Sequence, residues 1–294
     1  MSAEEGRALI TGGTGQLGRE LAGTVPPGWC ALAFGSAELD VTQAGVVADV
    51  LARVRPAVVI NAAAYTAVDA AEAEPDRAHA VNAEGAGNVA EACRRVGARM
   101  IQVSTDYVFD GAASRPYRPD DRPRPLGTYG RTKLAGEREV IRLLGDEAVI
   151  LRTSWLYSRW GRNFVLTMLR LFEERDEVAV VQDQVGVPTW SRSLAEAIWV
   201  AASRPEVRGI HHWTDEGPTS WYDFAMAIQA EALELGMLRR QVPIRPLHTD
   251  QYPTAAQRPP YSVLDATMTE AALRLPRRHW RVSLQHMLQD LARA

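Results

Sequence analysis

The chain has 294 residues, of which 46% are hydrophobic and 23% charged, as is ordinary for a globular protein with a sizeable core. The formal net charge of −3 comes without any block of basic residues, so we expect no nucleic-acid partner. No apolar stretch approaches the roughly 20 residues that a membrane helix needs, and no signal segment precedes the first apolar run, so we expect a cytoplasmic protein without a membrane partner.

Strand and helix patterns alternate along the chain. This alternation predicts a doubly wound α/β fold, a parallel Rossmann sheet with helices on both faces. The predicted strands are, in chain order, 7–11, 30–34, 57–61, 99–104, 148–152 and 209–213. The predicted helices are 16–21, 43–55, about 75–96, 129–144, 163–174 and 191–202.

Two segments interrupt the alternation. Segment 112–127 holds four prolines and is predicted to be a loop, and the chain beyond Gln241 is rich in proline and loops. We therefore expect two domains, with a smaller C-terminal substrate-binding cap over the carboxyl edge of the sheet, where such sheets bind ligands. The dinucleotide-binding domain is predicted at 1–155 and about 187–240, and the cap at about 156–186 and 241–294.

The two cysteines, Cys30 and Cys93, fall in a predicted strand and a predicted helix. Both are expected to be buried, reduced thiols rather than reactive groups.

A glycine-rich loop, Gly12-Gly13-Thr14-Gly15-Gln16-Leu17-Gly18, connects the first predicted strand to the first helix. Positions without a Cβ allow the backbone to approach a pyrophosphate that lies on the helix N-terminus. Because the loop opens a series of strand and helix units, we expect it to bind a dinucleotide cofactor.

The end of the second strand bears on which nicotinamide is used. An acidic residue there would hold the adenine ribose of NAD, but the strand ends Phe34-Gly35-Ser36, with no acid before Glu38. Arg19, next to the last loop glycine, could reach a 2′-phosphate. We therefore favour NADPH, with NADH as the alternative.

Tyr129 and Lys133 lie four residues apart on a predicted helix, so both side chains project from one face. Lys133 is the one lysine among 33 basic residues, which suggests a task that arginine cannot perform. A neighbouring ammonium lowers the pKa of a phenol, and the tyrosine could then donate its proton to a carbonyl oxygen as hydride arrives. A surface pair is the alternative, but eight tyrosines and one lysine would rarely fall in this spacing by chance.

Small and hydroxylic residues end two neighbouring strands. Thr105 ends the fourth strand, where its hydroxyl can bond a substrate carbonyl or Tyr129. The run Asn61-Ala62-Ala63-Ala64-Tyr65-Thr66 ends the third strand with small side chains that let a flat ring lie close, and Thr66 could bond a ribose.

His211 and His212 are the most obvious candidate metal ligands. Adjacent strand residues point to opposite faces, and no third ligand has a suitable spacing, so we predict no metal site.

Taken together, these residues resemble the extended short-chain dehydrogenase/reductase superfamily and, within it, the dTDP-4-dehydrorhamnose reductase family. The resemblance covers nearly the whole chain. The matching segments are 12–18, 61–69, 104–111, 129–133, 152–157, 163–164, 183–189, 252–254 and 258–259.

The resemblance implies an oxidoreductase whose substrate is a dTDP-4-keto-6-deoxy sugar, dTDP-4-dehydro-L-rhamnose, and which reduces its C4 ketone to give dTDP-L-rhamnose. Its catalytic positions fall on Thr105, Tyr129 and Lys133. Its cofactor positions fall on Gly12, Gly15, Gln16, Leu17, Gly18, Asp40, Val41, Ala63, Ala64, Tyr65, Thr66, Tyr129 and Lys133. Its sugar-nucleotide positions fall on Thr105, Asp106, Tyr129 and Trp155.

The chain departs from the family at two places. Ala70 replaces the usual lysine after Val68-Asp69, so any substrate contact made by that lysine is absent. Some members form homodimers through a magnesium ion held by glutamates. Glu20 and Asp290 match two of those positions but Arg192 occupies the third, so we predict no bridging metal and leave a homodimer open.

Two other functions stay open. A sister reductase acting on another dTDP-4-keto-6-deoxy sugar, for instance in antibiotic biosynthesis, would need the same catalytic residues. A non-catalytic regulatory subunit, like that of methionine adenosyltransferase, would not need Thr105, Tyr129 and Lys133, yet all three are present.

Overall fold

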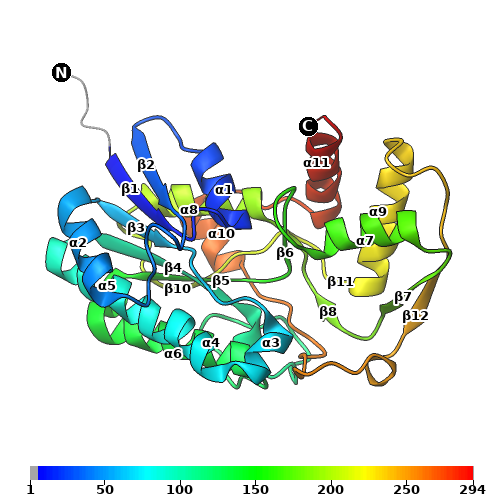
Figure 1. Ribbon diagram of the computed structural model, residues 1–294, viewed down its shortest axis with the longest axis horizontal. Helices are drawn as coiled ribbons and strands as arrows, with labels where there is room; N and C mark the ends of the chain where they lie inside the picture. The colour runs from blue at the N-terminus through cyan, green and yellow to red at the C-terminus, as the bar shows by residue number, and fades with distance from the viewer. Residues whose placement is uncertain (1–5, 294) are drawn as a thin grey trace.

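Six strands form a central parallel sheet in the computed structural model, which describes residues 6–293 (Figure 1). They are β1 (Gly6–Thr11), β2 (Trp29–Phe34), β3 (Val58–Asn61), β4 (Arg99–Thr105), β5 (Val149–Thr153) and β10 (Gly209–His212). Their order across the sheet is β10-β5-β4-β3-β1-β2, and every neighbouring pair is parallel. The chain leaves β1 toward β2 on one side and toward β3 on the other, so a topological switch point lies between β1 and β3.

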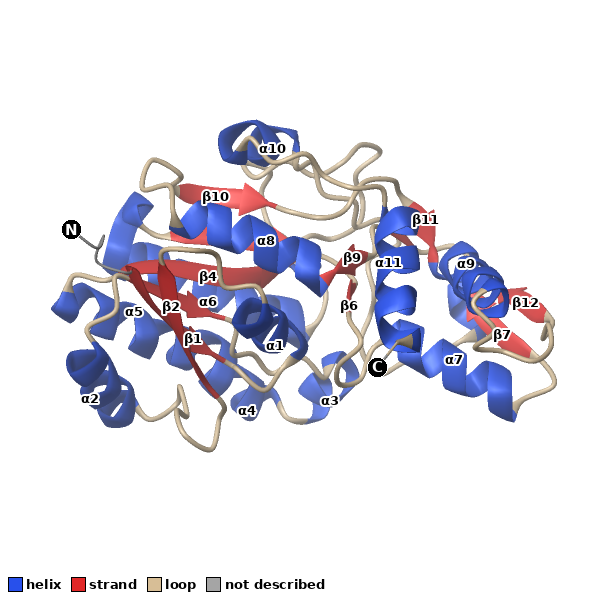
Figure 2. Ribbon diagram, turned by 90° about the horizontal axis from the view of Figure 1, so that it is seen from above, coloured by secondary structure: helices blue, strands red, loops and turns tan. Residues whose placement is uncertain are grey.

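Helices cover both faces of this sheet, which confirms the predicted fold class (Figures 1 and 2). The helices concerned are α1 (Gln16–Gly23), α2 (Ala44–Val54), α5 (Gly85–Val96), α6 (Thr128–Leu144), α8 (Ser191–Ala202) and α10 (Thr267–Leu273). Successive strand residues point to opposite faces, so Ala8 and Ile10 pack in one apolar cluster with α1 and α8, whereas Leu9 packs in another with α2 and α5. Within residues 6–293, no helix is both long enough and apolar enough to cross a lipid bilayer.

A second lobe has an apolar cluster of its own, drawn at the right of Figure 1. It is built from α7 (Phe164–Glu174), α9 (Trp221–Glu234), α11 (Trp280–Ala292) and the parallel strands β7 (Val178–Val181) and β12 (Ile244–Leu247). Two short strand pairs complete it, β6 (Leu156–Tyr157) with β9 (Thr189–Trp190) and β8 (Val185–Gly186) with β11 (Thr219–Ser220). The division into two domains stays a prediction, and Leu273 of α10 packs against the main sheet rather than in this lobe.

The predicted helix 75–96 is divided by one wide turn. It consists of α4 (Pro75–His79), a π-helical turn (Ala80–Glu84) and α5. Buried Asn82 lies in this turn, where its side chain bonds both backbone groups of Tyr65, at 2.8 and 3.1 Å, and Thr132 Oγ1 at 3.1 Å. The extra residue of a π turn therefore places an amide where it joins the loop after β3 to α6.

The sequence patterns missed several elements. The helix α3 (Val68–Ala73) and the paired strands after β5 are too short for a clear periodicity, while α10, α11 and β12 lie beyond Gln241, where prolines and loops obscured it. The helix α9, which lies before that segment, was missed as well. The prediction that Cys30 is buried is wrong: it is exposed, because β2 is an edge strand. Cys93 is buried in α5 as expected, and burial raises the pKa of its thiol to about 12.

A close approach between Gly136 and Asn82 makes Gly136→Ala destabilising. Helix propensity alone would favour alanine by about 1 kcal/mol, but a Cβ at Gly136 of α6 would collide with the Asn82 carbonyl oxygen. We expect overpacking to lower the free energy of unfolding by about 1–3 kcal/mol, measured by denaturant titration.

Gly87→Ala is the matched control, because the nearest atom to its added Cβ would be Glu139 Cβ at an ordinary 3.6 Å. This variant should be neutral or stabilising. Equal stabilisation of both variants would show that the packing of the π turn against α6 tolerates a methyl group.

Candidate active site

A cavity of about 690 Å³ lies at the carboxyl edge of the sheet. Its walls come from the loop after β1, the ends of β3, β4 and β5, the first turns of α6, and the first residue of α9. All residues at the predicted catalytic, cofactor and sugar-nucleotide positions line this cavity, although their roles stay predictions. They are Gly12, Gly15, Gln16, Leu17, Gly18, Asp40, Val41, Ala63, Ala64, Tyr65, Thr66, Thr105, Asp106, Tyr129, Lys133 and Trp155.

The glycine loop fits a dinucleotide. Gly12 has a φ of +66°, and a Cβ there would lie 2.7 Å from the Ala62 carbonyl oxygen. A Cβ at Gly18 would collide with the Gly12 carbonyl, so this glycine permits close packing of the helix on the loop. Gly15 is the N-cap of α1, and the first turn of that helix faces the cavity with backbone N–H groups that a helix leaves unbonded. Such a turn is suited to a pyrophosphate.

The second lobe holds the glycine loop through Gln16. Its Oε1 accepts hydrogen bonds from Ser158 Oγ at 3.1 Å and from Asn163 Nδ2 at 3.0 Å. Asn163 is also the N-cap of α7, since its Oδ1 accepts from the Leu166 N–H at 3.1 Å. The first helix of the second lobe is thus fixed to the predicted cofactor loop.

Arg19 does not take the position expected of a 2′-phosphate ligand. Its Nε donates to the Thr14 carbonyl at 3.0 Å, its guanidinium lies over the Trp160 ring, and it is not among the residues that line the cavity. The arginines that line the cavity are Arg77 and Arg162.

Tyr129 and Lys133 project from the first two turns of α6 into the cavity. Burial raises the pKa of Tyr129 to about 12, opposed by a hydrogen bond with Thr105. We predicted that Lys133 would lower the pKa of Tyr129. This prediction is wrong for the structure described, because loss of hydration around the buried phenol is the largest effect and raises the pKa. Lys133 instead donates from Nζ to the Val103 carbonyl at 2.7 Å, and burial lowers its pKa to about 8. Tyr129 keeps its proton at neutral pH, which is the form that a proton donor needs.

Thr105 and Asp106 form the end of β4. Thr105 Oγ1 accepts from the Tyr107 N–H at 3.2 Å and donates to Asp106 Oδ1 at 3.1 Å. The other carboxylate oxygen of Asp106 is buried and has no hydrogen-bond partner. Burial raises the pKa of Asp106 to about 7, and the neighbouring hydroxyl groups of Ser262 and Thr105 partly oppose this rise. A carboxyl group with a spare oxygen on the cavity wall is suited to bind a hydroxyl.

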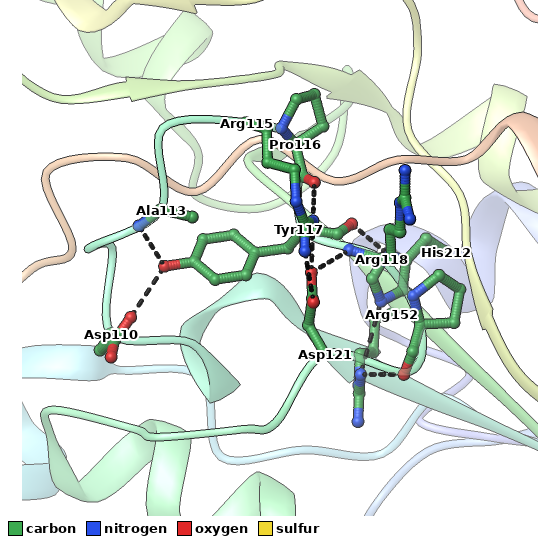
Figure 3. Close-up of polar contacts among 10 residues, drawn as sticks. Asp110, Ala113, Arg115, Pro116, Tyr117, Arg118, Asp121, Arg152 and His212 are labelled. Carbon is green, nitrogen blue, oxygen red and sulfur yellow. Dashed lines mark hydrogen bonds and ion pairs between the residues drawn. The ribbon is translucent and has the colours of Figure 1, made fainter.

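A buried ion pair lies behind the catalytic candidates. Glu137 of α6 binds Arg152 of β5 through two bonds of 2.9 and 2.7 Å and accepts a hydrogen bond of 2.5 Å from Ser104 of β4. Arg152 also donates to the Pro119 carbonyl at 3.3 Å and lies 3.4 Å from His212 Nε2 (Figure 3). This group therefore fixes α6 to the neighbouring strands β4 and β5 and to the predicted loop 112–127.

The histidine pair belongs to this framework. His212 Nδ1 lies 3.0 Å from the Tyr117 carbonyl, and burial together with Arg152 lowers the pKa of His212 to about 3 (Figure 3). No group of three or more candidate metal ligands was found within residues 6–293. At the predicted dimer-metal positions, Arg192 pairs with Asp290 at 3.2 Å and also opposes the rise in the pKa of Glu20 that burial causes.

The sequence analysis missed Glu72 of α3, which caps α6. Its Oε1 accepts from the Thr128 N–H at 2.6 Å and its Oε2 from Thr128 Oγ1 at 2.8 Å. Gly127, the N-cap residue, has no side chain for this task. The only sequence signal was that lack of a cap, because the carboxylate comes from 56 residues earlier in the chain. A negative charge at a helix N-terminus is stabilising, and here it holds the turn that bears Tyr129.

Comparisons with known proteins show relatives that match nearly the whole chain. The family model described as RmlD substrate binding domain matches residues 6–293. A dTDP-4-dehydrorhamnose reductase of Streptomyces griseus is 45% identical over 95% of this chain and 91% of its own length. One from Escherichia coli K12 is 39% identical over 96% of this chain and 97% of its own length. Among solved structures, a dTDP-4-dehydrorhamnose reductase from Bacillus anthracis in complex with NADP has a TM-score of 0.92 at 38% identity, covering 97% of this chain and 99% of that chain.

The buried carboxyl group of Asp106 should make stability depend on pH. Its pKa in the folded protein is about 7, against 3.8 ordinarily, so the folded state binds the extra proton between these values and loses stability as pH rises through about 7. Each pH unit in that interval costs about 1.4 kcal/mol. Asp106→Asn should therefore gain stability relative to the wild type as pH rises from about 4 to about 7 in denaturant titrations, and the difference should stay level above that.

Asp49 is exposed, so Asp49→Asn serves as the control for removing a negative charge without changing a buried group. A stability difference between wild type and Asp106→Asn that stayed constant with pH would show that Asp106 is not strongly desolvated.

Removing the Glu72 cap should affect both stability and turnover. We expect Glu72→Ala to lose about 0.5–2 kcal/mol of stability, and to lower kcat by about 10-fold to 100-fold because Tyr129 is displaced. Glu72→Gln, which keeps an acceptor, should retain much of both.

Glu139→Ala provides the comparison, since Glu139 is a half-buried residue of α6 that pairs only with Arg142 among the described contacts. Thermal melts and steady-state kinetics would test the three variants. A wild-type kcat in Glu72→Ala would show that the cap does not position Tyr129.

Proposed function

Because the chain belongs to the RmlD substrate binding domain family, that of the dTDP-4-dehydrorhamnose reductases, we propose that it reduces dTDP-4-dehydro-L-rhamnose to dTDP-L-rhamnose with NADPH. The observation that carries this proposal is that Tyr129, Thr105 and Lys133 share one cavity with a glycine loop shaped for a dinucleotide.

The residues that follow β2 favour NADPH over NADH as the cofactor. Ser36 lines the cavity there, whereas Glu38 is not among the lining residues and instead accepts a hydrogen bond from the Gly35 N–H at 3.0 Å. Neither Gly35 nor Ser36 offers a carboxylate to the adenine ribose, as an NAD-specific site would require. Asp40 also lines the cavity, but its Oδ1 accepts hydrogen bonds from the Thr42 N–H and Thr42 Oγ1. The structural relative from Bacillus anthracis was solved with NADP, which supports the same choice.

The first turn of α1 would hold the pyrophosphate, and the small residues after β3 would lie against the flat rings. When bound, NADPH supplies the hydride that adds to the C4 carbon. Tyr129 would donate its phenolic proton to the C4 oxygen, so that one hydride and one proton convert the ketone to an alcohol. Tyr129 would then recover its proton from solvent.

Thr105 and Lys133 would assist this proton transfer. Thr105 offers a neutral hydroxyl to the oxygen that gains charge, or to the phenol itself. Lys133 is 4% exposed and held by the Val103 carbonyl, so its ammonium lies at a fixed place in a site of low dielectric. Its positive charge would stabilise the phenolate that Tyr129 becomes once the proton has left.

Loss of the phenolic hydroxyl of Tyr129 should greatly lower the turnover rate without weakening the binding of NADPH. We expect wild-type protein to oxidise NADPH when dTDP-4-dehydrorhamnose is added, and Tyr129→Phe to lower kcat by about 10²–10⁴-fold. The Kd for NADPH, measured by fluorescence titration, should change little because the glycine loop is untouched.

Tyr222→Phe on α9 is the matched control, since Tyr222 does not line the cavity. If the wild type ignores this substrate but reduces another dTDP-4-keto-6-deoxy sugar, the sister reductase is the correct function. If it turns over none of these sugars and instead copurifies with a synthetase, a regulatory role replaces the enzymatic one.

A further inference from the structure

Trp155 adopts a backbone conformation that bulky residues avoid. It lies two residues after the end of β5, lines the cavity and has a φ of +46°. A left-handed conformation costs a residue with a large side chain on the order of 1–3 kcal/mol, and it persists only where the surroundings impose it. The structure therefore has to contain contacts that hold this indole in place.

Two residues of the second lobe supply those contacts. The ring of Trp221 stacks on that of Trp155 with centroids 3.5 Å apart and planes 7° from parallel. Gly186 packs against the same indole, since a Cβ there would lie 2.5 Å from Trp155 Cε2 and 2.7 Å from Nε1. The indole thus occupies a slot that only a glycine at position 186 leaves open.

The strand pair β8–β11 brings the two sides of this slot together. Gly186 of β8 pairs with Thr219 of β11, two residues before Trp221. The helix that Trp221 begins is capped by Ser220, whose Oγ accepts from the Asp223 N–H at 3.0 Å. Behind Trp221 lies the ring of Phe164 at 4.7 Å, in the apolar cluster of the second lobe. Trp221 is therefore fixed by its own lobe.

We propose that Trp221 is a positioning residue for the sugar nucleotide: it holds the Trp155 indole at the cavity wall, where that ring contacts the deoxysugar. The inference rests on the proposed function. Both rings line the cavity that also holds Tyr129, and an aromatic wall suits the apolar face and methyl group of a 6-deoxy sugar. The stack joins the second lobe to the end of β5, so substrate binding depends on a residue outside the sheet.

Two variants each change one of the two residues between which the Trp155 indole lies. Trp221→Leu keeps an apolar contact for Phe164 but cannot stack, and Gly186→Ala adds a methyl group where the indole lies. Each should weaken binding of dTDP-L-rhamnose about 10-fold by calorimetry and raise KM for the sugar nucleotide similarly, with the Kd for NADPH unchanged. The far-ultraviolet exciton couplet of the stacked indoles should disappear in both.

A matched control and a double variant complete the test. Trp29→Phe alters another tryptophan pair, Trp29 with Trp199, that lies outside the cavity, and should leave sugar-nucleotide binding unchanged. Because Trp221 acts through Trp155, the double variant Trp155→Ala/Trp221→Leu should bind no more weakly than Trp155→Ala alone.

Wild-type affinity for dTDP-L-rhamnose in Trp221→Leu, or full additivity in the double variant, would overturn the inference while leaving the proposed reductase intact. If one slot variant does not fold, the other carries the same test. A wild-type protein that neither binds dTDP-L-rhamnose nor turns over its keto precursor would overturn both.

Discussion

The carboxylate of Glu137 joins the three elements on which the candidate site is built. It lies on α6 four residues after Lys133, binds Arg152 three residues before Trp155, and accepts a hydrogen bond from Ser104 beside Thr105. Side chains of this pair are 1% and 2% exposed, so the two charges have lost their hydration and depend on each other. Removing one partner of such a buried pair commonly costs 3–5 kcal/mol, because the other charge is left without compensation. The positions of Thr105, Lys133 and Trp155 are therefore linked through one buried interaction.

Each remaining wall of the cavity is tied to this framework by a contact between distant segments. Glu72 caps α6 from α3, and Asn82 joins the loop after β3 to α6. Gln16 joins the glycine loop to α7. Parallel strands all end at the same edge, which brings their terminal residues near one another, but side-chain contacts of this kind set the final geometry.

The sequence predicted those parts of the site that depend on local spacing. Glycines at fixed intervals after a strand, and a tyrosine four residues before the only lysine, identify a cofactor loop and a candidate acid without knowledge of the fold. The roles of Glu72 and Trp221 could not be found in this way, since each depends on a partner more than 50 residues away in the chain. The exposure of Cys30 depends on which strand forms the edge of the sheet, and that order is not encoded in local periodicity.

The pKa of Tyr129 shows a further limit of spacing arguments. Helical periodicity correctly placed Tyr129 and Lys133 on the same cavity, yet it could not give the degree of desolvation, which raises the pKa to about 12. For a reductase the raised value is compatible with function, because the acid must hold its proton until the carbonyl oxygen gains charge. To predict the pKa of a side chain, its degree of burial must therefore be known as well as its charged neighbours.

The scarcity of lysine has a practical consequence. A protease specific for lysine has a single peptide bond to cleave in this protein, the one after Lys133, and that residue is 4% exposed in the middle of α6. Cleavage there requires the helix to open, so its rate reports the local unfolding of the element that bears the candidate acid. Cleavage of the unlabelled native chain would therefore report how often the helix that bears Tyr129 and Lys133 opens.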